Sequence, residues 1–155
     1  MENKTNRRSL FKKAGLALAG IFGVSAGISK AAAPKKQVLK ESVVMQDNVP
    51  LFSGGVRHGN TLYIAGKGAH FEGDIKAHTD HVLKELEKEL IKNGSSMDKV
   101  LKVNVYLHDL EDYQGMNEVY RGRFGANPPV RTTVAVYGGV PGDSLVEIDC
   151  IAAVD

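Results

Sequence analysis

The order of helical and strand-like segments predicts an α+β domain in which a single sheet carries two helices on one face. One segment has the spacing of an amphipathic helix, and a second has a shorter apolar stripe at helical spacing. The other apolar runs are short and rich in Val, Ile and Thr, as strands are. The order reads ββαβαββ, and right-handed crossovers place both helices on the same side of the sheet. The other face must then be covered, and we expect oligomerisation to cover it.

The first strands are expected to be short. Glu41–Gln46 has the composition of a short strand, and Asp47–Pro50 has that of a turn. Leu51–Arg57 and Thr61–Ala65 are apolar runs on either side of His58-Gly59-Asn60, whose glycine and asparagine tolerate positive φ angles. We therefore expect these two runs to pair as a hairpin.

Two segments predict the helices. Asp74–Asn93 begins with a candidate N-cap, Asp74, and its apolar residues share one face: Ile75, Val82, Leu83, Leu86 and Leu90. Leu110–Phe124 is expected to be the second helix, with an apolar stripe of Tyr113, Met116, Tyr120 and Phe124. Two glycines inside this segment weaken the helix by about 1 kcal/mol each relative to alanine.

Three later segments predict the remaining strands. In Val100–Leu107, apolar residues alternate with polar ones, so one face of the strand is apolar. Arg131–Tyr137 follows two prolines, which end the preceding structure and begin a new element. Leu145–Ala153 is the last strand and contains the only cysteine of the chain, Cys150, which we expect to be a small core residue.

Residues 1–33 have the organisation of a secretory signal peptide, and residues 34–155 are expected to form the mature domain. A basic start precedes an uncharged apolar run, Ala14–Ile28, and small residues follow at the expected cleavage region. The segment Arg7-Arg8-Ser9-Leu10-Phe11-Lys12 resembles a twin-arginine signal, which directs export. We therefore expect a periplasmic, or otherwise extracytoplasmic, protein with no stable membrane association after cleavage. An uncleaved N-terminal anchor is the alternative.

The charge of the expected mature domain argues against nucleic-acid binding. Residues 34–155 hold 14 basic and 17 acidic residues, a net charge of −3, whereas the whole chain carries +2. Surfaces that bind nucleic acids are basic. We therefore expect no nucleic-acid partner.

The histidines do not form a metal-binding pattern. His78 and His81 are three residues apart in the expected first helix, but no His-Glu-x-x-His motif is present and no cysteine lies nearby. We expect both to be solvated, and no metal site. His70, just past a glycine-rich bend, is a candidate for lining a cleft. Residues 34–155 also lack a Gly-x-Ser-x-Gly motif and a Cys/His nucleophile pair, which argues against covalent catalysis.

Arg131 and Glu147 are the candidate functional residues that remain. Arg131 stands at the start of a strand rich in Thr and Val, and Glu147 stands among Val, Leu and Ile in the last strand. Two interpretations are open. The two residues could form a structural ion pair between adjacent strands, or they could face a ligand in a cleft.

Several blocks of the chain carry a resemblance to a known family. Two of them are Pro128-Pro129-Val130-Arg131-Thr132-Thr133-Val134 and Val146-Glu147-Ile148-Asp149-Cys150-Ile151-Ala152. Three further blocks match in order, over residues 56–66, 94–107 and 112–124. Together they span about residues 50–153 and resemble the RidA/YjgF family of imine deaminases, which has also been called endoribonuclease L-PSP.

The resemblance implies a chorismate-mutase-like fold and a homotrimer with its sites in clefts between subunits. The implied reaction is hydrolysis of reactive 2-imino and enamine acids to 2-keto acids and ammonia. Arg131 would bind the substrate carboxylate, and Glu147 would activate the attacking water. Gly66 would bring the backbone close to the ligand, and Asn117 would support the site by hydrogen bonding. No metal or organic cofactor is implied.

Three positions depart from the family pattern. Phe52 stands where active members have tyrosine, and Ala65-Gly66-Lys67 stands where they have Ser-Gly-Gln. We expect Phe52 and Lys67 to line the substrate-binding site in an altered form. These changes favour an alternative function, a catalytically silent trimer that binds small carboxylates in the same clefts. Endoribonuclease activity, which the older family name suggests, fits the net charge of the mature domain least well.

Overall fold

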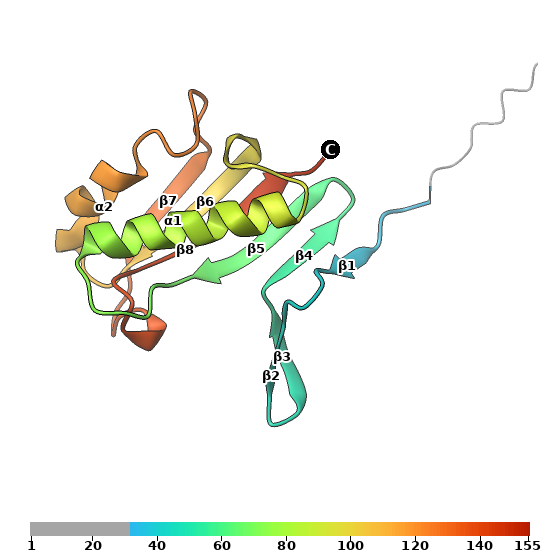
Figure 1. Cartoon of the computed structure of the whole chain (residues 1–155), viewed down its shortest axis with the longest axis horizontal. Helices are drawn as coiled ribbons and strands as arrows, with labels where there is room; N and C mark the ends of the chain where they lie inside the picture. The colour runs from blue at the N-terminus through green and yellow to red at the C-terminus, as the bar shows by residue number, and fades with distance from the viewer. Residues whose placement is uncertain (1–31) are drawn as a thin grey trace, which may run out of the picture. The chain divides into compact units, whose positions relative to one another are not determined.

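The computed structural model describes residues 32–155, and Figure 1 shows the path of the chain. The twin-arginine segment and nearly all of the expected signal peptide lie outside the described residues. Within residues 32–155, no helix is both long enough and apolar enough to cross a membrane.

A six-stranded sheet is the main element of the fold. Its strands run in the order β1-β4-β5-β8-β6-β7. They are β1 (Lys36–Val38), β4 (Gly55–His58), β5 (Thr61–Lys67), β6 (Val100–Leu107), β7 (Val130–Ala135) and β8 (Val146–Ala153). All neighbouring strands are antiparallel except β6 and β7, which are parallel. Helices α1 (Ile75–Lys92) and α2 (Tyr113–Tyr120) lie on one face of the sheet (Figure 1), which confirms the expected α+β fold.

The N-terminal strands differ from the expected single hairpin. β2 (Val43–Gln46) and β3 (Val49–Ser53) form a separate two-stranded sheet. Asp47 and Asn48 take φ angles of 49° and 63° and form the tight turn between the two strands. Val49 and Pro50, which were expected in the turn, are therefore the first two residues of β3. Pro50 is tolerated in this strand because the pairing register shifts beside it.

The apolar run expected over 51–57 is consequently interrupted. Its first half belongs to β3, and only its second half, β4, joins the main sheet. The break falls at Gly54, where the chain passes from one sheet to the other. The hairpin of β4 and β5 around His58–Asn60 is as expected, with His58 paired to Thr61.

Helix α1 packs on the sheet through the face that its sequence predicts. Asp74 accepts a hydrogen bond from the backbone N–H of Ala77 at 2.8 Å and caps the helix. Ile75 is partly buried. The buried residues of the helix are Val82, Leu83, Leu86 and Leu90, as predicted, together with His78 and Thr79.

The second helix is shorter than expected. A 3₁₀ turn at Leu110–Asp112 leads into α2, which ends at Tyr120 rather than at Phe124. Gly122 takes a φ angle of 78°, which a right-handed helix cannot accommodate. The predicted apolar stripe is nevertheless correct, because Met116, Tyr120 and Phe124 are buried and Tyr113 is partly buried.

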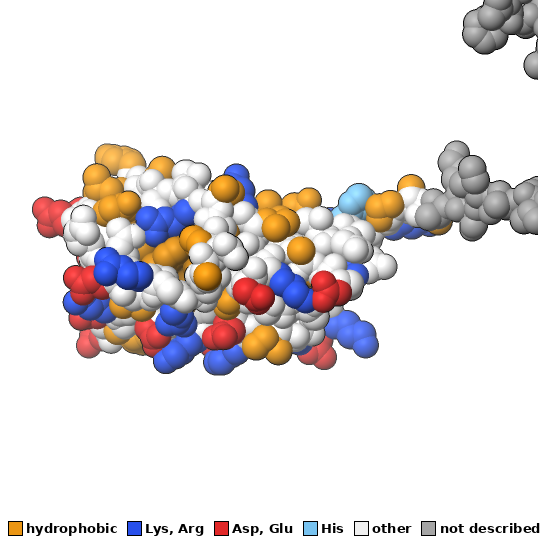
Figure 2. Space-filling view, turned by 90° about the horizontal axis from the view of Figure 1, so that it is seen from above, with side chains coloured by type: hydrophobic (Ala, Val, Ile, Leu, Met, Phe, Trp, Pro, Cys, Tyr) orange, Lys and Arg blue, Asp and Glu red, His pale blue; other side chains and the backbone are white. Residues whose placement is uncertain are grey.

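The face of the sheet opposite the helices is open in the described chain. The alternation predicted for β6 is confirmed, since Val103, Val105 and Leu107 are fully buried on the helix side. Hydrophobic side chains on the open face remain exposed: Tyr63, Val130 and Val134. Figure 2 shows charged side chains of both signs along one edge of the view and hydrophobic side chains, with few charges, along the opposite edge. An exposed apolar sheet face of this kind is typical of a surface that binds another protein or another subunit.

Candidate active site

Arg131 lies near the start of β7 and points to the helix side of the sheet. Its register partner on β6 is Val103, which is fully buried under the helices. Nη1 of the guanidinium group donates a hydrogen bond to Oδ1 of Asn117 at 2.8 Å. The guanidinium carbon lies 4.6 Å from the centre of the Tyr120 ring, within the range of a cation–π interaction. The structure thus brings Arg131 and Asn117 together.

Helix α2 presents the residues that hold this arginine at helical spacing. Tyr113, Met116, Asn117 and Tyr120 share one face of the helix. Besides its contacts with Asn117 and Tyr120, Arg131 donates from Nη2 to the Tyr113 hydroxyl at 3.4 Å, and Nη1 lies 4.0 Å from Sδ of Met116. The two tyrosines were predicted only as core residues. Their spacing relative to Asn117 is the signal that could have identified them.

Glu147 lies on β8 and points to the open face of the sheet. Its neighbours along the strand, Val146 and Ile148, are fully buried on the helix side. The carboxyl group lies against Gly66 of β5, and a β-carbon at that position would overlap with Oε1. The orientation of Glu147 therefore requires a glycine at position 66. The structure brings these two predicted site residues together.

A hollow of about 160 Å³ adjoins Glu147 on the open face, and its other lining residues are Tyr106, Val136, Gly139, Val140 and Pro141. The Tyr106 hydroxyl donates to Asp149 at 3.1 Å, and Asn104 donates to the other oxygen of that carboxylate at 2.9 Å. Partial burial raises the pKa of Tyr106, and the hydrogen bond to Asp149 raises it further. Asp149 was not a candidate. Its position two residues after Glu147 on an alternating strand places both carboxylates on one face.

Arg131 and Glu147 do not meet within one protomer. Strand β6 separates their strands, and their side chains point to opposite faces of the sheet. The ion pairs within residues 32–155 involve other side chains. A structural ion pair between Arg131 and Glu147 of the same protomer is therefore excluded. A site that uses both residues needs a second copy of the chain.

Phe52 lies on the β2–β3 hairpin, away from the main sheet. Its side chain is 52% exposed, and its neighbours Val44, Val49 and Leu51 are also exposed. Within one protomer it contacts neither of the two charged candidates. An exposed apolar hairpin is a typical contact surface for another subunit.

Lys67 and Gly66 are adjacent in sequence but are oriented towards opposite faces of the sheet. The register of β5 shifts between Ile64 and Lys67, and Lys67 pairs with Ile148, whose side chain is buried on the helix side. Lys67 therefore points away from the face that carries Glu147. Within one protomer, Gly66 is next to Glu147 and Lys67 is not.

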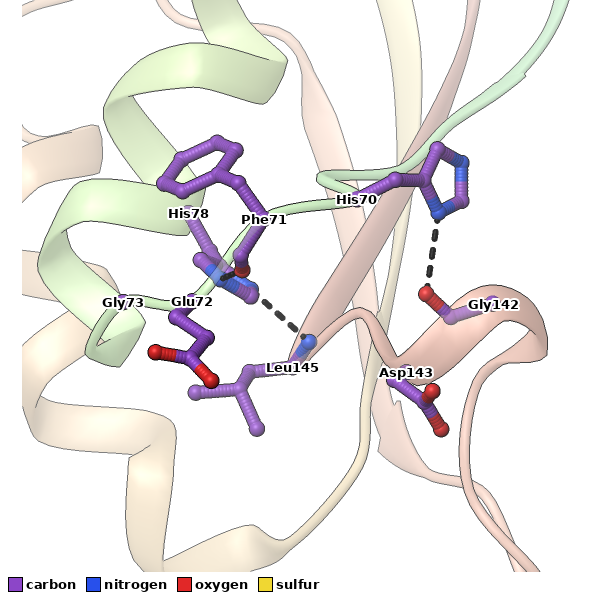
Figure 3. Close-up of a pocket in the computed structure, with 8 residues that line it drawn as sticks. All are labelled: His70, Phe71, Glu72, Gly73, His78, Gly142, Asp143 and Leu145. Carbon is purple, nitrogen blue, oxygen red and sulfur yellow. Dashed lines mark hydrogen bonds between the residues drawn. The ribbon is translucent and has the colours of Figure 1, made fainter.

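A second hollow, of about 550 Å³, lies where the chain passes from β5 into α1 (Figure 3). His70 lines it, as the sequence suggested, and its Nδ1 lies 3.0 Å from the carbonyl oxygen of Gly142. His78, expected in solvent, is only 2% exposed. Its Nε2 lies 2.8 Å from the carbonyl oxygen of Phe71, and its Nδ1 accepts from the Leu145 backbone N–H at 3.1 Å. The expectation was wrong because segments distant in sequence cover this histidine.

Cys150 is buried in β8, as expected of a core residue. Burial is the main cause that raises the pKa of its thiol to about 12, and the charge of Asp149 adds to it. A thiol that stays protonated at neutral pH is a weak nucleophile. Within residues 32–155, no group of three or more His, Cys, Asp or Glu side chains could hold a metal ion.

Comparisons with known proteins agree on one family. A family model described as Endoribonuclease L-PSP matches residues 28–154. A RutC family protein of Pyrococcus horikoshii is 38% identical over 123 residues, which cover 72% of this chain and 97% of the relative. Reactive Intermediate Deaminase A, chloroplastic, of Arabidopsis thaliana is 28% identical over 125 residues, covering 74% of this chain and 66% of the relative. The crystal structure of YyfA from Yersinia pestis, of the conserved Rid protein family, is similar with a TM-score of 0.68 and 27% identity, over 77% of this chain and 100% of that chain.

Proposed function

The chain belongs to the endoribonuclease L-PSP family, also known as RidA/YjgF, and from this premise we propose that it is an imine deaminase. The proposed reaction is hydrolysis of reactive 2-imino and enamine acids to 2-keto acids and ammonia. A relative of this chain bears the name Reactive Intermediate Deaminase A, which supports the proposal.

One observation carries the proposal. Arg131 and Glu147 are both partly buried, yet neither forms an ion pair within the described residues. Asn117 and Tyr120 hold the guanidinium group, while Gly66 leaves room for the carboxyl group of Glu147. Charged groups that are positioned by neutral neighbours and left without a charged partner are typical of a site that binds a charged ligand.

In the proposed reaction, Arg131 binds the substrate and Glu147 transfers a proton. The guanidinium of Arg131 binds the substrate carboxylate through two parallel hydrogen bonds. Glu147 accepts a proton from a water molecule as the water oxygen attacks the imine carbon. Glu147 delivers this proton to the nitrogen, which gives a carbinolamine. The hydroxyl proton of the carbinolamine then moves to the nitrogen as the carbon–nitrogen bond breaks, so that the keto group forms and ammonia leaves. One water is consumed for each ammonia released, and no electrons are transferred, so the reaction requires no redox cofactor.

The proposed assembly is a homotrimer. Because Arg131 and Glu147 point to opposite faces of one sheet, we propose that Arg131 of one copy and Glu147 of another form each site. The open apolar face of the sheet and the exposed β2–β3 hairpin supply the contact surfaces. Association of this kind covers apolar surface that the described chain leaves exposed.

An imine-hydrolysis assay tests the proposal. An amino-acid oxidase generates the 2-imino acid in place, and ammonia release is followed with and without the purified protein. We expect the wild-type protein to accelerate ammonia release, and Arg131→Ala and Glu147→Gln each to reduce the acceleration by about tenfold or more. The absence of any acceleration by the wild-type trimer would rule out the proposed reaction.

The second candidate function is a non-catalytic trimer that binds small carboxylates. It is favoured by the departures from the family pattern, because Phe52 and Ala65 lack hydroxyl groups that active members have and Lys67 replaces an amide with a cation. Calorimetric titration with a 2-keto acid separates the two functions. Binding that depends on Arg131, without turnover of the 2-imino acid, would select the binding protein.

We also propose that the domain acts outside the cytoplasm, on the strength of residues 1–33. Replacement of Arg7 and Arg8 by lysine would abolish twin-arginine export while leaving the domain unchanged. Mass spectrometry of the protein from cell fractions tests this. An uncut N-terminus in the cytoplasmic fraction of the wild type would contradict it.

A further inference from the structure

The hydrogen bonds of Arg131 leave part of its guanidinium group unused. Of its five N–H donors, the two on Nη1 face Asn117 Oδ1 and Met116 Sδ, and one on Nη2 faces the Tyr113 hydroxyl. The Tyr120 ring covers one face of the guanidinium plane. One donor on Nε and one on Nη2 have no partner in residues 32–155. A carboxylate accepts hydrogen bonds from two such donors in parallel.

The Tyr113 hydroxyl lies next to this unused edge. It accepts a hydrogen bond from Nη2 of Arg131 at 3.4 Å, and the guanidinium carbon lies 5.9 Å from the centre of its ring. A hydroxyl group that accepts one hydrogen bond still has its own proton to donate. Within the described residues, that proton has no acceptor. The group therefore has a free donor beside the two free donors of Arg131.

We propose that Tyr113 is a further substrate-binding residue, whose hydroxyl donates a third hydrogen bond to the carboxylate held by Arg131. This inference rests on the proposed function, in which Arg131 binds a substrate carboxylate. It adds that the hydroxyl of Tyr113 recognises the same carboxylate. Three donors on two side chains then surround the carboxylate.

The packing of α2 does not account for this hydroxyl group. The ring of Tyr113 is partly buried against the core, and a phenylalanine would pack equally well there. The other tyrosine at this arginine, Tyr120, differs in this respect. Its hydroxyl is buried without a hydrogen-bond partner in the described chain. Within the described residues, Tyr113 is therefore the one of these two tyrosines whose hydroxyl lies within hydrogen-bond distance of the guanidinium group.

Calorimetric titration of the full chain with pyruvate tests the inference, because pyruvate has the carboxylate of the substrate and is not turned over. We expect Tyr113→Phe to weaken pyruvate binding by about tenfold, as expected for a lost hydrogen bond to a charged group. Pyruvamide, which has no carboxylate, should bind the wild type and Tyr113→Phe equally.

Two outcomes would overturn the inference, and they distinguish it from its premise. If the wild type binds pyruvate and Tyr113→Phe binds it equally well, the role of Tyr113 is wrong while the proposed function stands. If the wild type does not bind pyruvate, the proposed carboxylate site is wrong as well.

Discussion

Arg131 and Glu147 lie on opposite faces of one sheet, with the whole of strand β6 between their strands. Arg131 is held from the helix side by α2, and Glu147 rests against Gly66 on the open side. No rotamer change within one protomer brings the two charged groups to the same ligand. If both act on one substrate, as we propose, each site belongs to two copies of the chain.

The first prediction is complementation between two inactive variants. Arg131→Ala and Glu147→Gln should each lack activity alone, whereas trimers assembled from both should recover it. With random mixing in a cyclic trimer, about a quarter of the sites would receive an intact arginine and an intact glutamate. Ammonia release from the refolded or co-expressed mixture measures this recovery.

Mixing Arg131→Ala with the Arg131→Ala, Glu147→Gln double variant is the control, because no site then has an arginine. This mixture should stay inactive. Equal inactivity of the complementing mixture, despite assembled trimers, would show that the two residues do not share a site.

The second prediction concerns Asn117. Asn117→Asp places a carboxylate where the amide oxygen now lies, 2.8 Å from Nη1 of Arg131. The new negative charge competes with the substrate carboxylate for the guanidinium group and repels it. We expect KM for the 2-imino acid to rise by about tenfold or more, with a smaller effect on kcat. Asn117→Gln, which is neutral, should raise KM less, and an Asp variant with wild-type KM would contradict the proposed substrate position.

The third prediction concerns Gly66. Gly66→Ala introduces a β-carbon into the position of the Glu147 carboxyl group, so that side chain must move. We expect a loss of kcat of about tenfold or more with the fold retained. Gly68→Ala is the matched control, because its β-carbon would lie 3.4 Å from the nearest atoms, close to ordinary contact distance. Equal activity of both variants and the wild type would show that the orientation of Glu147 is not needed.

The fourth prediction concerns stability at alkaline pH. Burial raises the pKa of Cys150 to about 12 from 9.0, and that of Tyr120 to about 12 from 10.0. Each group therefore loses its proton at a lower pH in the unfolded chain than in the folded one. Its contribution to stability is complete below the pKa that it has in the unfolded chain, and this contribution is lost as the pH rises towards 12. The free energy of unfolding should fall by about 1.4 kcal/mol per pH unit for each group between these values.

Urea denaturation between pH 8 and pH 11.5 measures this slope. Cys150→Ala should flatten the slope from about pH 9 upward, and Tyr120→Phe from about pH 10 upward. The comparison is made between variants, because other groups titrate over the same range. Parallel curves for the wild type and both variants would contradict the assignment.

The helices and the buried faces of the strands could be predicted because their signals are local. The apolar stripe of α1 and the alternation in β6 are periodic patterns, and both were confirmed by the burial of Leu86 and Val105. The hairpin of β2 and β3 was missed although the signal for its turn is also local. Asp47 and Asn48 form its turn with positive φ angles, and their sequence did not distinguish a two-residue turn from a longer one.

His78 shows how a tertiary contact can contradict a local pattern. It stands among polar residues in the sequence, which suggested solvent exposure. The backbone groups of Phe71 and Leu145 form hydrogen bonds with both of its ring nitrogens and cover it. The second of these residues lies 67 positions away in the chain, so no window along the helix contains the information.

Arg131 and Glu147 could be named as candidate functional residues without coordinates, since the blocks around them are local in the sequence. The directions in which their side chains point depend on how the strands pair. The side of the sheet on which Arg131 lies depends on its parallel pairing with β6, and the space for Glu147 depends on Gly66 of a strand far away in sequence. Strand order and register are set by the packing of the whole domain, because a strand alternates its two faces whichever neighbours it acquires.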